Sequence, residues 1–166
     1  MPYYFAYGSN MNVARVEARI GATRRSLSGV LLDHALRFDK ASRVAGIAHA
    51  NVVPVAGEKV EGALFELLEP DQIERMDPFE GYPSEYERHR LPIVTREGPI
   101  EAWVYIAAPG TTAKALKPAR EYLDHLLAGE PFLSVEYHRR LAEVEAVHDL
   151  EDRLLLLLGL SRHSPR

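Results

Sequence analysis

The hydrophobic pattern of the first twenty residues changes from that of a strand to that of a helix. The aromatic run Tyr3 to Tyr7 predicts a buried strand that ends at a glycine, where a tight turn is favoured. Apolar residues then recur at helical spacing over positions 13–20, with Asn10 or Asn12 available as the N-cap and Gly21 as the stop. The pattern therefore predicts a strand, a turn and a helix in direct succession.

Short hydrophobic runs predict further strands up to residue 107. They span 29–38, 46–53, 59–68, 87–95 and 100–107. In the run 59–68 both alternating faces carry apolar side chains, so we expect this strand to lie centrally in its sheet. The segment 69–77 has helical spacing, and we expect that helix to end at Asp77-Pro78 because proline disfavours helical backbone in the residue before it.

Helical spacing returns from about residue 118. Helices are predicted over 118–129, over 135–147 after Ser134 as N-cap, and over 149–158. Strands precede these helices, and no repeat or long linker separates the two parts of the chain. The pattern favours one α+β domain over residues 1–166 with a largely antiparallel sheet.

Composition narrows the possible functions. The chain has 166 residues and no cysteine, which excludes disulfides, thiolate metal sites and thiol nucleophiles and fits a reducing compartment, so we expect a cytoplasmic protein. A net charge of −4 with dispersed Lys and Arg leaves no basic footprint for nucleic acid. None of the seven histidines pairs with another at the i, i+4 spacing of helical metal ligands, so no metal is expected.

Membrane association is not expected either. The N-terminal residues lack the basic and apolar regions of a signal peptide. The longest apolar block, Leu154 to Leu158, is far shorter than the roughly 20 residues that span a bilayer. This block, extended to Leu160, packs on its own core or forms a dimer surface, and the first alternative is favoured. A monomer or a homodimer is therefore expected.

Gly8-Ser9-Asn10 is the first stretch with candidate chemistry. Between a strand and a helix, successive backbone N–H groups lack partners and can converge on an anion, and a glycine permits positive φ and close approach. The alternative is an ordinary helix cap, because Ser and Asn are common caps. Ser9 as a nucleophile is disfavoured because no histidine is close in sequence.

Glu80 is the second candidate. Its neighbours Phe79 and Tyr82 could desolvate the carboxylate and raise its pKa toward the range useful for proton transfer near neutrality. The alternative is a solvated glutamate in a loop. These residues alone do not decide between the two.

Four ordered motifs carry a resemblance to the gamma-glutamylcyclotransferase family. They are "YFAYGSNM", "GIAHANVVPVAGEKVEGALFEL", "MDPFEGYPSEYERHRLPIV" and "PAREYLDHLLAGEPFLSVEYHRRL", and they cover roughly residues 3–141. Met76 stands where the family usually has Leu, which is an apolar exchange, while Asp77 and Glu80 keep the family spacing.

The resemblance implies a small mixed, largely antiparallel β-barrel flanked by helices. It also implies that a gamma-glutamyl compound closes to 5-oxoproline and releases an amino acid or amine, without metal or organic cofactor. By matching position, Glu80 is the general acid/base and Tyr7, Gly8, Ser9, Asn10 and Tyr86 bind the substrate. Tyr122 and Tyr137 are expected to serve packing.

Two alternatives remain open at this point. The chain could be a non-catalytic module that binds gamma-glutamyl groups or other anions, or an enzyme that removes a gamma-glutamyl group from a specialised metabolite. Fold alone does not separate these functions.

Overall fold

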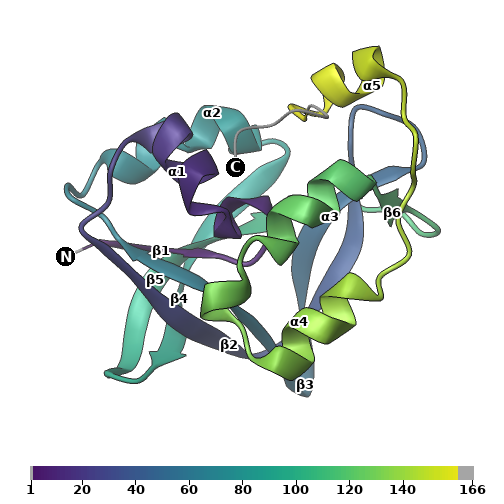
Figure 1. Cartoon of the computed structure of the whole chain (residues 1–166). Coiled ribbons are helices and arrows are strands. Elements are labelled where there is room, and N and C mark those ends of the chain that lie inside the picture. The colour runs from purple at the N-terminus through teal and green to yellow at the C-terminus, as the bar shows by residue number, and fades with distance from the viewer. Residues whose placement is uncertain (1, 161–166) are drawn as a thin grey trace.

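Five strands form a closed barrel in the computed structural model, which describes residues 2–160. They are β1 (Tyr3–Ala6), β2 (Arg25–Ala41), β3 (Ile47–Glu66), β4 (Tyr86–Thr95) and β5 (Gly98–Ala107). Their order is β1-β5-β4-β2-β3, and β3 also pairs with β1 to complete the ring (Figure 1). Only the β1–β5 pairing within this ring is parallel, so the predicted mixed, largely antiparallel barrel is confirmed. A two-residue strand, β6 (Lys117–Pro118), adds to β3.

The long β2–β3 hairpin corrects one prediction. The expected strands 46–53 and 59–68 are one strand, β3, because both parts pair with β2. The register moves from Leu32 opposite Lys59 to His34 opposite Pro54, so residues 55–58 bulge out of the ladder. Gly57, at φ 84°, donates its N–H to Asp33 Oδ1 at 3.0 Å. A bulge of this kind interrupts the sequence pattern without ending the strand.

Helices cover the barrel at its ends and on one side (Figure 1). The α-helices are α1 (Val13–Ile20), α2 (Asp77–Glu80), α3 (Arg120–Leu127), α4 (Val135–Ala142) and α5 (Asp152–Leu157). Three 3₁₀ turns, η1 (Ser9–Met11), η2 (Gln72–Arg75) and η3 (Glu130–Phe132), complete the described elements. Ser134 caps α4 by accepting the Tyr137 N–H at 3.2 Å, as predicted, but α4 ends before the expected residue 147.

The segment before Glu80 differs from its prediction. Asp77-Pro78 does not end a helix but begins α2, directly after η2. Proline is tolerated in the first turn because N–H groups there have no intrahelical acceptor. Gly81 ends α2 in the left-handed conformation at φ 62°. Glu80 is therefore the last residue of a helix and does not lie in a loop.

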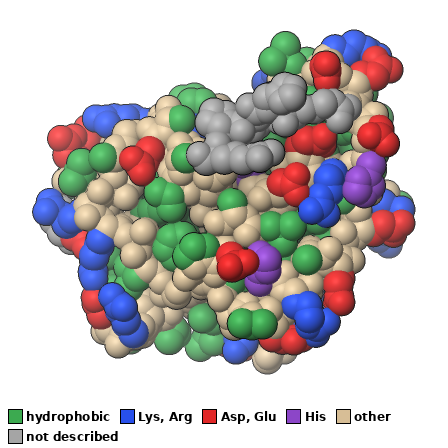
Figure 2. Space-filling view, viewed as in Figure 1, with side chains coloured by type: hydrophobic (Ala, Val, Ile, Leu, Met, Phe, Trp, Pro, Cys, Tyr) green, Lys and Arg blue, Asp and Glu red, His purple; other side chains and the backbone are tan. Residues whose placement is uncertain are grey.

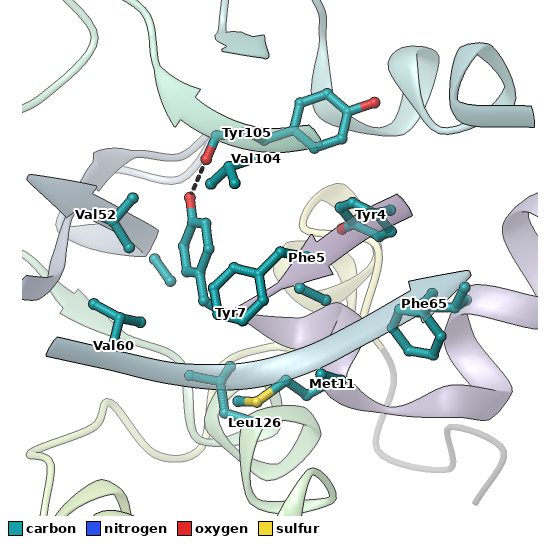
Figure 3. Close-up of a cluster of buried hydrophobic side chains, with 14 of the residues drawn as sticks. Tyr4, Phe5, Tyr7, Met11, Val52, Val60, Phe65, Val104, Tyr105 and Leu126 are labelled. Atoms are coloured by element: carbon teal, nitrogen blue, oxygen red, sulfur yellow. Dashed lines mark hydrogen bonds between the residues drawn. The ribbon is translucent and has the colours of Figure 1, made fainter. Parts of the chain in front are cut away.

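The core lies inside the barrel and beneath α3. Figure 3 shows Phe5 from β1 and Phe65 from β3 close to Met11 and Leu126, and all four are fully buried. Gly62 on β3 allows this packing, since a Cβ there would collide with the Ala6 carbonyl oxygen and the Phe5 ring. The first strand is thereby held against β3 at the point where its chain turns into η1.

The C-terminal apolar block packs mainly on the protein itself. Leu155, Leu158 and Leu160 are buried in the core cluster, whereas Leu156 and Leu157 are exposed. Within residues 2–160, no helix has the length and hydrophobicity needed to cross a membrane. Figure 2 shows acidic and basic side chains interspersed over the described part of this face, with hydrophobic side chains also exposed near α5.

Candidate active site

One cavity of about 560 Å³ brings together all six candidate residues from the sequence. They come from the end of β1, η1, α2 and the start of β4, and they are Tyr7, Gly8, Ser9, Asn10, Glu80 and Tyr86. Residues from α1, β2, β3, β5, α3 and the end of α5 also line it. The closure of the barrel thus joins parts of the chain that are more than 70 residues apart.

The turn at Gly8 presents unpartnered N–H groups to this cavity. Two carbonyl oxygens of the turn already accept hydrogen bonds. Met11 N–H donates to Gly8 O at 3.0 Å, and Asn12 N–H donates to Ser9 O at 3.2 Å. In contrast, the N–H groups of Gly8, Ser9 and Asn10 find no acceptor within residues 2–160. Three successive free donors on a cavity wall can hold an anionic oxygen.

Gly8 has φ −114°, so the turn does not use the positive φ that a glycine permits. The close approach of neighbouring atoms is the feature that favours a glycine here. A Cβ would lie 3.2 Å from Tyr122 Oη and 3.4 Å from the Ala50 Cβ, which would crowd the cavity wall.

Of the two predicted N-cap residues, Asn12 and not Asn10 stands at the start of α1. Asn12 occupies the N-cap position of α1 but makes no capping bond, and its amide instead meets His125 Nδ1 at 3.1 Å. Asn10 is buried in η1 and does not cap α1.

Asn10 connects the turn to Glu80. Its Nδ2 donates to Tyr4 Oη at 2.9 Å and lies 3.5 Å from Glu80 Oε1. Its Oδ1 accepts a hydrogen bond from Arg19 at 3.4 Å. The amide therefore fixes the free N–H groups and the carboxylate on the same side of the cavity.

Glu80 is a desolvated carboxylate without an ion pair inside the described chain. Burial raises its pKa above the ordinary value, while Arg19 and Arg15 offset part of the rise. Of the two sequence neighbours expected to desolvate it, Phe79 lines the same cavity, whereas Tyr82 does not. Rings from distant parts of the chain, such as those of Tyr7 and Tyr105, line the cavity as well.

Tyrosines fixed by backbone hydrogen bonds form much of the wall. Tyr86 Oη donates to Ala50 O at 2.7 Å, and Ala50 N–H donates to Tyr122 Oη at 2.9 Å. Tyr7 Oη donates to Tyr105 O at 2.5 Å (Figure 3). Burial raises the pKa of Tyr122 to about 12, so this phenol stays neutral. Tyr122 lines the cavity in addition to packing, which the sequence did not indicate.

Several cavity residues escaped the sequence analysis. Arg15 and Arg19 lie four positions apart on α1, a spacing that could have placed both on the face that follows the turn. Lys40 is buried at the end of β2 and donates to Glu85 Oε1 and to Ala41 O, both at 2.8 Å. No pattern in its strand distinguishes this lysine.

Histidine in the cavity is neutral, and a metal cluster is not formed by the described residues. Burial, together with the nearby Lys40, lowers the pKa of His49 to about 4. Within residues 2–160, no three His, Asp or Glu side chains are close enough to hold a metal ion.

A closed mixed barrel with a desolvated carboxylate beside free N–H donors is suited to an enzyme that acts on a small molecule with anionic oxygens. The family model described as "Gamma-glutamyl cyclotransferase, AIG2-like" matches residues 4–126. The chain belongs to this family, as the sequence motifs indicated. Membership supports an enzyme with a cyclotransferase-like activity.

Solved structures share the fold at low sequence identity. A gamma-glutamyl cyclotransferase is 21% identical with a TM-score of 0.77, and the match covers 95% of this chain and 97% of that chain. A human protein described as uncharacterized is 22% identical with a TM-score of 0.76, and the match covers 95% of this chain and 97% of that chain. A yeast cyclotransferase described as specific to glutathione is 13% identical with a TM-score of 0.55, covering 95% and 94%. A comparison with curated proteins gave no significant match.

Proposed function

We propose that this protein is a gamma-glutamyl cyclotransferase that releases 5-oxoproline and a free amino acid or amine, with Glu80 as the general acid/base. The observation that carries the proposal is that Glu80 lines the same cavity as residues 8–10, whose N–H groups are free, and that Asn10 Nδ2 lies 3.5 Å from the Glu80 carboxylate. Family membership supplies the reaction type.

Glu80 would take one proton from the attacking nitrogen and later give a proton to the leaving nitrogen. With the substrate's α-amine in its neutral form, the nitrogen attacks the γ-carbonyl carbon to form a five-membered ring and gives one proton to the carboxylate, so that the ring nitrogen keeps a single N–H. The carbonyl electrons move onto oxygen and then return, which breaks the bond to the leaving nitrogen. Protonated Glu80 gives its proton to that nitrogen, so the carboxylate is restored. A raised pKa suits both steps because it makes the carboxylate a better base near neutrality.

The rest of the cavity would bind and orient the glutamyl group. The N–H groups of Gly8, Ser9 and Asn10 are donors for an anionic oxygen of the substrate. The rings of Tyr7 and Tyr86 are held in place by their hydroxyl bonds to backbone carbonyls and form rigid walls. Because the attack is intramolecular, holding the ring-closing conformer lowers the barrier through proximity.

The test is an assay of a panel of gamma-glutamyl amino acids and gamma-glutamyl amines. We expect 5-oxoproline and the free amine to appear in equal amounts, measured by mass spectrometry, with no added metal. Stabilisation of the protein by 5-oxoproline against heat, with no turnover of any panel member, would instead support the binding module.

A further inference from the structure

Two arginines of the cavity have no part in the proposed proton transfer. Arg15 and Arg19 face the cavity from α1, and neither has a carboxylate within ion-pair distance in the described chain. Arg19 bonds Asn10 and lies 4.8 Å from the centre of the Phe79 ring. Burial, and the neighbouring Arg19, lower the pKa of Arg15 to about 10. Two like charges on one helix face repel each other unless an anion lies between them.

Arg15 has an unsatisfied donor. Its Nε is buried without a hydrogen-bond partner among the described residues, and one terminal nitrogen donates to Gly159 O at 3.3 Å. A buried N–H of a charged group without an acceptor is costly, so a ligand that accepts from it gains affinity. Guanidinium groups fit carboxylates particularly well because their donors are planar and paired.

The charge of the whole cavity points to the same kind of ligand. Its described lining contains four cationic side chains (Arg15, Arg19, Lys40 and Arg43) and two carboxylates (Glu80 and Glu85). The complete chain has a net charge of −4, so the excess of positive charge is local to the cavity. One carboxylate on the glutamyl half of a substrate would leave part of that excess unmatched.

The last residue of α5 and the two residues after it form the wall next to Arg15. Leu157, Leu158 and Gly159 line the cavity, and Leu157 is 51% exposed. Leu157 and Leu158 therefore place apolar side chains in the wall beside the guanidinium groups.

We propose that Arg15 and Arg19 bind a carboxylate on the leaving half of the substrate, and that Leu157 and Leu158 contact an apolar side chain on the same half. The preferred substrates are then gamma-glutamyl conjugates of amino acids with apolar side chains. This rests on the proposed function for the identity of the glutamyl half. The free N–H groups of residues 8–10 provide for that half, which leaves the guanidinium groups for the other.

Binding to the Glu80→Gln protein tests the subsite without depending on turnover. Two ligands share one carbon skeleton: gamma-glutamyl-leucine, and gamma-glutamyl-isoamylamine, which lacks only the second carboxylate. We expect calorimetry to show that the leucine conjugate binds roughly tenfold to a hundredfold more tightly than the amine conjugate. This difference is what one charge-assisted, hydrogen-bonded pair contributes to binding. Equal dissociation constants for the two ligands overturn the proposal.

Adding Arg15→Gln to that protein should remove most of this preference while changing the affinity for the amine conjugate less than about threefold. Arg15→Lys should retain part of it, which covers the case in which the glutamine variant folds poorly. The matched control is Arg139→Gln, an exposed arginine on α4 outside the cavity, which should keep the full preference. An equal weakening of both ligands by Arg15→Gln would show a structural role and overturn the assignment.

The apolar half of the proposal has its own comparison. Gamma-glutamyl-leucine should bind roughly tenfold more tightly than gamma-glutamyl-alanine, and Leu157→Asn should reduce that ratio to about threefold or less. A ratio that the substitution leaves unchanged overturns the contact with Leu157. If binding follows all these expectations but wild-type protein releases no 5-oxoproline, the proposed activity fails while the subsite stands.

Discussion

The two ends of helix α2 carry acids with opposite surroundings. Asp77 at its start accepts two hydrogen bonds from Arg88, at 2.8 and 3.1 Å, and one from Tyr105 Oη at 2.6 Å. Arg88 in turn lies over the ring of Trp103, 4.5 Å from its centre. Among residues 2–160, the Glu80 carboxylate at the other end has one hydrogen-bond contact, with Asn10 Nδ2 at 3.5 Å.

The difference separates a structural acid from a reactive one. The Asp77–Arg88 pair is about 85% shielded from solvent on both sides and fully hydrogen-bonded, so it anchors α2 to β4 and β5. Glu80 is partly buried and has no ion pair within residues 2–160, so desolvation is the largest influence on its pKa and raises it. The paired acid holds the helix in place, and the unpaired acid is left available to a ligand and a proton.

Loss of the unpaired acid should have the largest effect on activity. Glu80→Gln keeps the size and the contact with Asn10 but cannot take a proton, so we expect the rate of 5-oxoproline release to fall roughly a thousandfold. The measurement is kcat with the best panel substrate, and its Kd should change much less. A variant that keeps more than a tenth of the wild-type rate would assign the proton transfer to another group.

Loss of Arg88, the partner of Asp77, should affect the stability of the fold instead of the catalytic rate. Arg88→Met leaves Asp77 buried without its counter-ion, and we expect the free energy of unfolding to fall by about 2–4 kcal/mol. Urea unfolding measures the change. The control is Arg139→Met, whose exposed ion pairs should contribute less than about 1 kcal/mol. Similar losses in the two variants would remove the distinction between the ends of α2.

The sequence predicts one of these ends better than the other. The family resemblance identified Glu80 and the Gly8 turn, because the local residues alone left a solvated glutamate and an ordinary helix cap open. Arg88 and Tyr105 were not selected, since their contact with Asp77 exists only once β4 and β5 pair.

Errors in the predicted elements have the same tertiary origin. The bulge at residues 55–58 resembles a turn in sequence, but pairing with β2 continues the strand on both sides. Pro78 resembles a stop, but it falls in the first turn of α2, where proline fits. The cavity around Glu80 includes its neighbour Phe79 but also rings from distant parts of the chain, which no local pattern could have placed there.

The raised pKa of Glu80 predicts a smaller effect on stability with a defined sign. The folded protein binds the Glu80 proton more readily than the unfolded chain does, so stability falls as pH rises through the interval between the two pKa values. Glu80→Gln removes that fall and should raise the Tm at pH 7.5 by roughly a few degrees. The gain should vanish at pH 4, below the ordinary glutamate pKa of about 4.3. Glu58→Gln, at an exposed glutamate outside the cavity, should show no such gain. A Glu80→Gln protein less stable than wild type at pH 7.5 would mean that the arginines already neutralise the carboxylate.

The smallest effect is expected at a cavity residue whose polar atom is satisfied. Tyr86 lines the cavity, but its hydroxyl already donates to Ala50 O at 2.7 Å, so it resembles Asp77 more than Glu80 in its bonding. Tyr86→Phe keeps the ring and should lower the free energy of unfolding by about 1 kcal/mol while changing kcat/KM less than about threefold. Tyr86→Ala removes the wall and should weaken substrate binding roughly tenfold. If the phenylalanine variant instead lost as much activity as the alanine variant, the hydroxyl would act on the substrate directly, and a satisfied hydrogen bond would no longer mark a structural role in this cavity.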